Sequence, residues 1–121
     1  METFKIITAL HQSASFNTDL YSSIFIHDEI TELEYKSIRD TVVFTNKRLL
    51  VIDVQGISGR KKEFLSIPYS KITAFSGETA GTFDFDGELK VWVSGMPPLQ
   101  LQFLKGTNVK SPIQFISNYV L

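Results

Sequence analysis

The middle of the chain alternates hydrophobic and polar side chains with the period of two that is typical of β-strands. In Thr41–Thr45, Val42 and Phe44 share one face of the predicted strand. Asn46 then tolerates the positive φ that a tight two-residue turn requires. We therefore expect a hairpin that leads into a second strand over Arg48–Val54.

This second strand is hydrophobic on both faces from Leu49 to Ile52, so a sheet with one face in water does not accommodate it. We expect a helix or another subunit to cover its second face. Five further stretches are predicted to be strands because they alternate or lie between turn residues: 30–38, 62–67, 71–76, 82–94 and 99–103. Within the long one, Asp86-Gly87 is either a hairpin turn or a weak point inside one continuous strand.

Three segments have helical patterns. Hydrophobic residues at helical spacing predict a short helix over residues 3–12, and capping residues predict a second over 20–25. The chain ends on a third helix, in which Ser111 is the expected N-cap and Gln114 completes a capping box. Seven consecutive strands and this helix predict a mainly β fold: two orthogonally packed sheets, or an open barrel, of antiparallel strands capped by the C-terminal helix.

Several sequence blocks resemble a known family, the small bacterial pleckstrin-homology-like domains. The similarity runs from about Glu29 to the C-terminus and is strongest in four blocks, residues 38–40, 44–49, 66–69 and 88–93. It implies seven strands and a C-terminal helix, in agreement with the pattern. It also implies cytoplasmic homo-oligomers, ring-shaped, with no known catalytic activity. We accordingly divide the chain into an N-terminal helical extension, residues 1–28, and a pleckstrin-homology-like domain, residues 29–121.

Composition narrows the possible functions. The formal net charge of -1 argues against binding to nucleic acid by bulk electrostatics. The chain has no cysteine, which excludes disulfides and thiolate metal sites and is compatible with the cytoplasm. No stretch approaches the roughly 20 hydrophobic residues that a membrane-spanning helix needs.

A cluster of cations is expected at one end of the sheet. In a sheet of consecutive antiparallel strands, the connections after the first and the third predicted strand emerge at the same end. These connections carry five basic residues, Lys36, Arg39, Arg60, Lys61 and Lys62, which we call the basic rim. Such a rim could attract an anionic lipid or a phosphate, since each basic residue near an anionic membrane contributes about 1 kcal/mol.

The alternative is a solvated hairpin end, in which the charges of the basic rim pair with Glu63, Asp40 or a neighbouring subunit. Arg39 in particular could be a structural partner of Asp40 or of loop carbonyl groups. The phosphoinositide-binding members of the wider superfamily use a basic motif across the first strand, its loop and the second strand. Only Lys36 and Arg39 lie near that place here.

Three carboxylates, Asp84, Asp86 and Glu88, share one face if they belong to a continuous strand. Carboxylates so arranged can bind a hard divalent cation, although the spacing lacks the glycine and the distal glutamate of an EF-hand loop. The alternative is solvation of the carboxylates, or pairing with cations of an adjacent subunit, because like charges at this distance otherwise raise some of the pKa values.

Outward-facing hydrophobic side chains indicate self-association. Trp92 lies opposite the hydrophobic face of its strand, where a tryptophan usually packs under a helix or loop, but large aromatic side chains also anchor interfaces. With the two-sided strand, this gives a candidate oligomer interface of Leu50, Ile52, Asp84, Asp86, Glu88 and Trp92.

No pattern of residues predicts catalysis. His11 and His27 stand apart from potential metal ligands, and no serine occupies a nucleophile elbow. There is also no phosphate-binding loop and no dinucleotide fingerprint, so we expect no cofactor and no catalytic residues. The sequence therefore predicts a non-enzymatic module whose partner is a second copy of itself. Membrane lipid and divalent metal remain as alternative ligands, and an unknown protein as a further partner.

Overall fold

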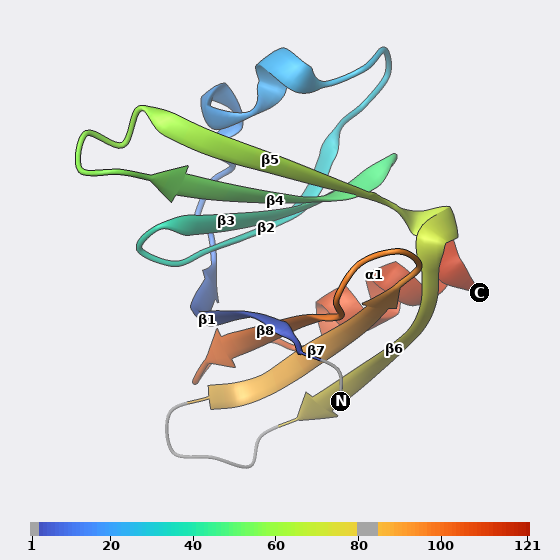
Figure 1. Ribbon diagram of the computed structural model, residues 1–121. Coiled ribbons are helices and arrows are strands. Elements are labelled where there is room, and N and C mark those ends of the chain that lie inside the picture. Colours follow the sequence, from blue (N-terminus) through green and yellow to red (C-terminus); the bar gives the residue numbers. More distant parts are fainter. Residues whose placement is uncertain (1–2, 80–84) are drawn as a thin grey trace. The chain divides into compact units, whose positions relative to one another are not determined.

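The structure is a computed structural model that describes residues 3–79 and 85–121, without the side chains of residues 85 and 86 (Figure 1). The described residues form eight strands: β1 (Lys5–Gln12), β2 (Thr31–Lys36), β3 (Asp40–Thr45), β4 (Arg48–Gln55), β5 (Lys61–Pro68), β6 (Ile72–Thr79), β7 (Phe85–Val93) and β8 (Leu99–Leu104). They also form three short 3-10 helices and one α-helix: η1 (Thr18–Leu20), η2 (Ser22–Ile24), η3 (Tyr69–Lys71) and α1 (Lys110–Val120). The chain divides into two compact units, which are described separately. Unit 1 is Met1–His11 with Tyr69–Leu121, and unit 2 is Gln12–Pro68.

Unit 2 is built on four antiparallel strands in the order β5-β4-β3-β2. The predicted hairpin is confirmed, because β3 pairs with β4 across Asn46 and Lys47, with Phe44 opposite Leu49. The predicted return strand is also confirmed, since β5 pairs with β4 along its whole length, from Arg48 opposite Pro68 to Gln55 opposite Lys61.

A segment of the same chain covers the second hydrophobic face of β4. Leu50 and Ile52 are fully buried in a cluster with Tyr21 and Val43. Around them pack partly buried hydrophobic side chains, Leu20, Ile24, Phe25 and Phe64, most of which come from the η1 and η2 region. The predicted second helix is thus present as two 3-10 turns. The required cover is intramolecular, so Leu50 and Ile52 contribute no exposed surface to an oligomer interface.

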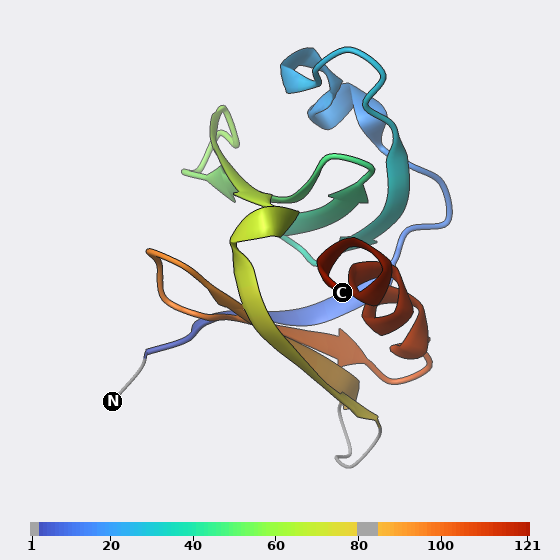
Figure 2. The ribbon, with the colours of Figure 1, turned by 90° about the vertical axis from the view of Figure 1, so that its right-hand side faces the viewer.

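Unit 1 contains a sheet in the order β1-β8-β7-β6, with α1 packed against β6 and η3. Figure 2 shows α1 nearly end-on. β7 is continuous through Gly87, which lies opposite Thr79 of β6, so Asp86-Gly87 is not a hairpin turn. β8 pairs antiparallel with β7 and parallel with β1.

The helix predicted over residues 3–12 is wrong, because Lys5–Gln12 is the strand β1. The β-branched Ile6, Ile7 and Thr8 favour a strand. Ala9 adopts a φ of 60°, and the register with β8 shifts between Ile7 and Leu10. This irregularity adds a residue and leaves Ile7 and Leu10 both buried three positions apart, which imitates helical spacing.

The strand count and the start of the C-terminal helix need correction. The described residues hold eight strands instead of seven, since β1 joins the sheet of unit 1, and its pairing with β8 is parallel. The C-terminal helix is present but begins at Lys110, so Ser111 is not its N-cap, and the residue at that position, Val109, makes no side-chain capping bond. Instead, Asn108 accepts a hydrogen bond from the Lys110 amide at 3.0 Å. Of residues 1–28, those up to His11 belong to unit 1 and those from Gln12 belong to unit 2, and the predicted division into an extension and a domain stays a prediction.

Candidate functional site

The basic rim lies at one end of unit 2, where the β2–β3 and β4–β5 connections meet. Arg39 joins the two connections, because its backbone carbonyl oxygen accepts a hydrogen bond from the Val54 amide at 3.0 Å. Its guanidinium donates to the carbonyl oxygens of Val54 at 3.1 Å and Gly56 at 3.2 Å. Figure 1 shows both loops on the left-hand side of unit 2. The expected juxtaposition is therefore present, and Arg39 is a structural partner of loop carbonyl groups.

The remaining cations of the basic rim, Lys36, Arg60, Lys61 and Lys62, are exposed. None of them belongs to an ion pair that the structure shows between described residues. Carboxylates lie one step further along the strands, where Asp53 is opposite Asp40 on β3 and Glu63 on β5. Five cations and three carboxylates therefore lie at this end of the sheet, and together they carry a net positive charge.

Two isoleucines project from the same loops. Ile38 in the β2–β3 connection and Ile57 in the β4–β5 connection are fully exposed, at 101% and 105% of the reference surface of the residue. Ile38 directly precedes Arg39, and Ile57 directly follows Gly56. The hydrogen bond from the Arg39 guanidinium to the Gly56 carbonyl oxygen therefore joins the chain next to each isoleucine. Alternation along the strands did not single out either one, because both lie in turns.

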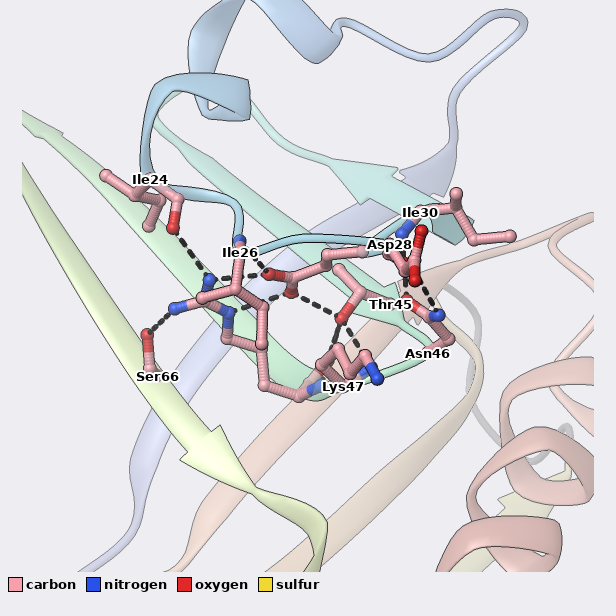
Figure 3. Close-up of polar contacts among 10 residues, drawn as sticks. Ile24, Ile26, Asp28, Ile30, Thr45, Asn46, Lys47 and Ser66 are labelled. Atoms are coloured by element: carbon pink, nitrogen blue, oxygen red, sulfur yellow. Dashed lines mark hydrogen bonds and ion pairs between the residues drawn. The ribbon is translucent and has the colours of Figure 1, made fainter.

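A buried ion pair, which sequence reasoning missed, holds the segment before β2 to the sheet (Figure 3). Glu29, whose side chain is fully buried, accepts hydrogen bonds from Arg48 at 2.6 and 2.8 Å and from the Thr45 hydroxyl at 2.7 Å. The Arg48 guanidinium also donates to the Ile24 carbonyl oxygen and the Ser66 hydroxyl, both at 2.9 Å. A network this well satisfied fixes η2, the β3–β4 turn and β5 to one another.

The β3–β4 turn contributes a second set of bonds. The Asn46 side chain accepts a hydrogen bond from the Ile30 amide and donates to the Asp28 carbonyl oxygen, both at 2.8 Å. The Asn46 side chain thus provides hydrogen-bond partners for two backbone groups just before β2, as Figure 3 also shows. The Thr-Asn-Lys-Arg sequence at this turn is explained by structural bonds to the preceding segment.

The ion pair makes stability depend on pH. Burial acts to raise the pKa of Glu29, but the hydrogen bonds from Arg48 and Thr45 outweigh it and lower the pKa from 4.5 to about 2. The ionised carboxylate therefore contributes stability that is complete above about pH 4.5 and lost as the pH falls towards 2. We expect this group alone to account for about 3 kcal/mol between pH 7 and pH 2.

The measurement is the free energy of unfolding by urea across this pH range, for the wild type and for Glu29→Gln. The variant should be less stable at pH 7 and should lose less stability on acidification. Equal pH dependence of the two proteins would contradict the assignment to Glu29.

A second buried carboxylate anchors the same segment. Glu34 is fully buried in β2 and accepts hydrogen bonds from the Tyr21 hydroxyl at 2.6 Å and the Asn17 amide at 3.0 Å. The Tyr21 hydroxyl also lies 3.1 Å from the Thr31 hydroxyl. Burial, with the bond to Glu34, raises the pKa of Tyr21 well above its usual range. Glu34 therefore acts as a structural acceptor here, with no exposure to an outside ligand.

Only part of the predicted acidic face can be located. Asp84 lies outside the described residues, as does the side chain of Asp86. Glu88 accepts a hydrogen bond from Gln100 at 2.6 Å and pairs with Lys90 at 3.6 Å. Its hydrogen bond with Glu78 raises the pKa of the Glu78 carboxyl. Within the described part of the chain, no group of three or more potential ligands is placed to hold a metal ion.

Trp92 lies on the outer face of the unit 1 sheet. Its ring packs edge-on against Phe4, with centroids 5.9 Å apart, and the Lys90 ammonium lies 5.9 Å from the Phe4 centroid. Residues that lie opposite one another on neighbouring strands point to the same face of a sheet. Ile6 lies opposite Gln100, and Gln100 lies opposite Lys90, so Ile6 is on the same face as Lys90 and Trp92 and is 55% exposed there. We call Phe4, Ile6 and Trp92 the aromatic face.

The other sequence-based candidates have local roles or none. His27 is almost fully exposed and lies 3.2 Å from its neighbour Asp28. His11 is exposed on β1. No helix among the described residues is long and hydrophobic enough to cross a membrane.

Comparisons with known proteins identify the family. The chain is 50% identical over 88 residues to the uncharacterized protein YjqA of Bacillus subtilis (strain 168), a match that spans 71% of this chain and 70% of that protein. A crystal structure of a DUF1696 family protein with a pleckstrin-homology domain, from Shewanella loihica PV-4, is similar with a TM-score of 0.81 and 42% identity, covering 94% of this chain and 99% of that one.

A second crystal structure, of a pleckstrin homology domain from Shewanella amazonensis SB2B, has a TM-score of 0.67 and 46% identity, covering 86% of this chain and 85% of that one. The model of the bacterial PH domain family matches residues 4–120. The match thus includes β1 and the segment with η1 and η2 as well as the strands that carried the resemblance. The chain belongs to the bacterial PH domain family.

Proposed function

We propose that the chain is a cytoplasmic, non-enzymatic interaction module that assembles into a symmetric, ring-like homo-oligomer. The observation that carries this proposal is the edge of unit 1. β6 is the terminal strand of its sheet, so one side of its backbone is available to a strand of another copy. Family membership supports a binding role, since the bacterial PH domain family is generally one of binding modules.

The two edge strands differ in protection. β5 carries Lys61, Lys62 and Pro68, residues that discourage pairing with another chain. β6 has no lysine or proline among its eight residues, and its exposed positions include Ala74, Ser76 and Thr79. Because β6 has neither lysine nor proline along its eight residues, its edge favours pairing with a strand of a second copy.

The aromatic face lies next to this edge and enlarges the surface that a second copy could contact. Ala74 and Ser76 of β6 are opposite Trp92 and Lys90, so their side chains lie on the same outer face. Trp92 and Phe4 are half-buried, whereas Ile6 is largely exposed. Aromatic side chains of this kind contribute most to binding when an interface buries them completely.

The test is the solution mass by light scattering across protein concentrations. We expect a stable multiple of 13.7 kDa for the wild type. The double variant Ala74→Lys, Ser76→Lys should be a monomer, because two ammonium groups beside the edge cannot be buried. A matched control adds the same charge on the exposed positions of α1 with Gln114→Lys, Asn118→Lys, and should keep the wild-type mass. A monomeric wild type, or an assembled β6 variant, would refute the proposal.

A further inference from the structure

The basic rim and the two exposed isoleucines form one surface at the end of unit 2. Single exposed hydrophobic residues are common and carry no meaning by themselves. Ile38 and Ile57 differ in two respects, since each is completely exposed and each is next to a residue that the Arg39 bonds hold together. The structure therefore presents two hydrophobic tips whose backbones are fixed relative to one another.

The charges around the tips determine what could cover them. Four cations of the basic rim flank the tips without an ion pair among the described residues: Lys36, Arg60, Lys61 and Lys62. A ligand made only of phosphates would leave the two isoleucines in water, and a purely hydrophobic surface would leave the cations without partners. An anionic lipid bilayer satisfies both, because its headgroups attract lysine and arginine while the region just below accepts hydrophobic side chains.

We propose that this chain docks on anionic membranes by inserting Ile38 and Ile57 at the headgroup level while the exposed cations of the basic rim contact lipid phosphates. Recognition depends on charge and hydrophobic insertion and not on the stereochemistry of one headgroup. The Arg39 guanidinium donates hydrogen bonds to the Val54 and Gly56 carbonyl oxygens. It therefore holds the surface together instead of binding a headgroup, which agrees with recognition that is not stereospecific. This docking is independent of the β6 edge.

The experiment is flotation of the full chain with vesicles of phosphatidylcholine alone or of phosphatidylcholine with phosphatidylglycerol. We expect binding only to the anionic vesicles, weakened by added salt. The double variant Ile38→Ser, Ile57→Ser should reduce the partition coefficient about tenfold or more. Because both side chains are fully exposed, this variant should fold normally, and Leu121→Ser is the control for loss of an exposed hydrophobic residue at 91% exposure.

A charge-reversal variant tests the second half of the surface. Arg60→Glu, Lys61→Glu, Lys62→Glu should abolish binding to the phosphatidylglycerol vesicles. The matched control reverses three exposed lysines of unit 1, Lys71, Lys105 and Lys110, to glutamate, which changes the net charge equally and should retain binding. Circular dichroism and thermal melting confirm that each variant is folded.

Several outcomes would overturn the proposal. A wild type that ignores anionic vesicles at low salt contradicts it directly. An equal loss of vesicle binding in the charge control would show that only net charge matters. Full binding by the isoleucine variant would show that Ile38 and Ile57 do not insert into the bilayer. Vesicles in which a phosphoinositide replaces phosphatidylglycerol at matched charge should bind equally well, so a strong preference for the phosphoinositide would point to a stereospecific headgroup site instead.

Discussion

Replacing Arg48 by methionine should lower the free energy of unfolding by about 3–5 kcal/mol, because it leaves a buried carboxylate without its counter-charge. Glu29 has no exposed side-chain surface, and Arg48 supplies its two shortest charged contacts, at 2.6 and 2.8 Å. The same substitution also removes the donors to Ile24 and Ser66. The methionine keeps the hydrophobic stem, so the loss reports mainly the charge and the hydrogen bonds.

The measurement is urea unfolding at pH 7 followed by far-ultraviolet circular dichroism. Arg39→Met is the matched control, because Arg39 is exposed and its two bonds to carbonyl oxygens should account for only about 1 kcal/mol. The double variant Glu29→Gln, Arg48→Met should be more stable than Arg48→Met alone, since no charge then remains buried. A loss in Arg48→Met no larger than in Arg39→Met would show that Glu29 is solvated when its partner is absent.

The sequence predicted those parts of the fold whose signals are local. Alternation over 41–45 and 48–54, with Asn46 between them, defines a hairpin without reference to the rest of the chain. The hydrophobic run Leu49–Ile52 further showed that a second cover must exist. It did not show which segment supplies the cover, because the η1 and η2 residues are brought to Leu50 and Ile52 by tertiary packing.

The error over residues 3–12 has a physical origin. A strand irregularity places two buried residues three positions apart, and a periodicity argument then favours a helix over a strand. The β-branched residues Ile6, Ile7 and Thr8 favour a strand, and here that preference outweighs the spacing of the buried residues. Pairing of β1 with β8 joins residues 93 or 94 positions apart and leaves no local signal.

The candidate surfaces were predictable to a similar extent. The basic rim followed from connectivity, since alternate connections of antiparallel strands emerge at the same end. The ion pair of Glu29 and Arg48 did not, because the two residues are 19 positions apart in different elements. Ile38 and Ile57 were also missed, since their exposure is set by the turns that hold them and not by a pattern along the strands.

Gly87→Ala should also be strongly destabilising, by about 3 kcal/mol, because there is no space for a β-carbon at this position. Gly87 lies inside the continuous strand β7, where the added carbon would overlap the Glu78 carbonyl oxygen of β6 and approach the Val109 side chain to 3.1 Å. The obstacle is backbone, so it cannot be relieved by rotating a side chain. Either β6 or β7 must shift, and the pairing between Glu78 and Glu88 is weakened with it.

Gly77→Ala is the informative comparison for this prediction, since both glycines lie in the β6–β7 pair. An added β-carbon at Gly77 meets the Cδ1 and Cγ1 atoms of the Ile113 side chain on α1, and a side chain can move away more readily than a backbone carbonyl group can. We therefore expect thermal melting to show a smaller loss for Gly77→Ala than for Gly87→Ala. The reverse order would mean that the β6–β7 pair adjusts at Gly87 more readily than α1 repacks, and that the packing of α1 on β6 contributes more to the stability of unit 1 than the register of the two strands.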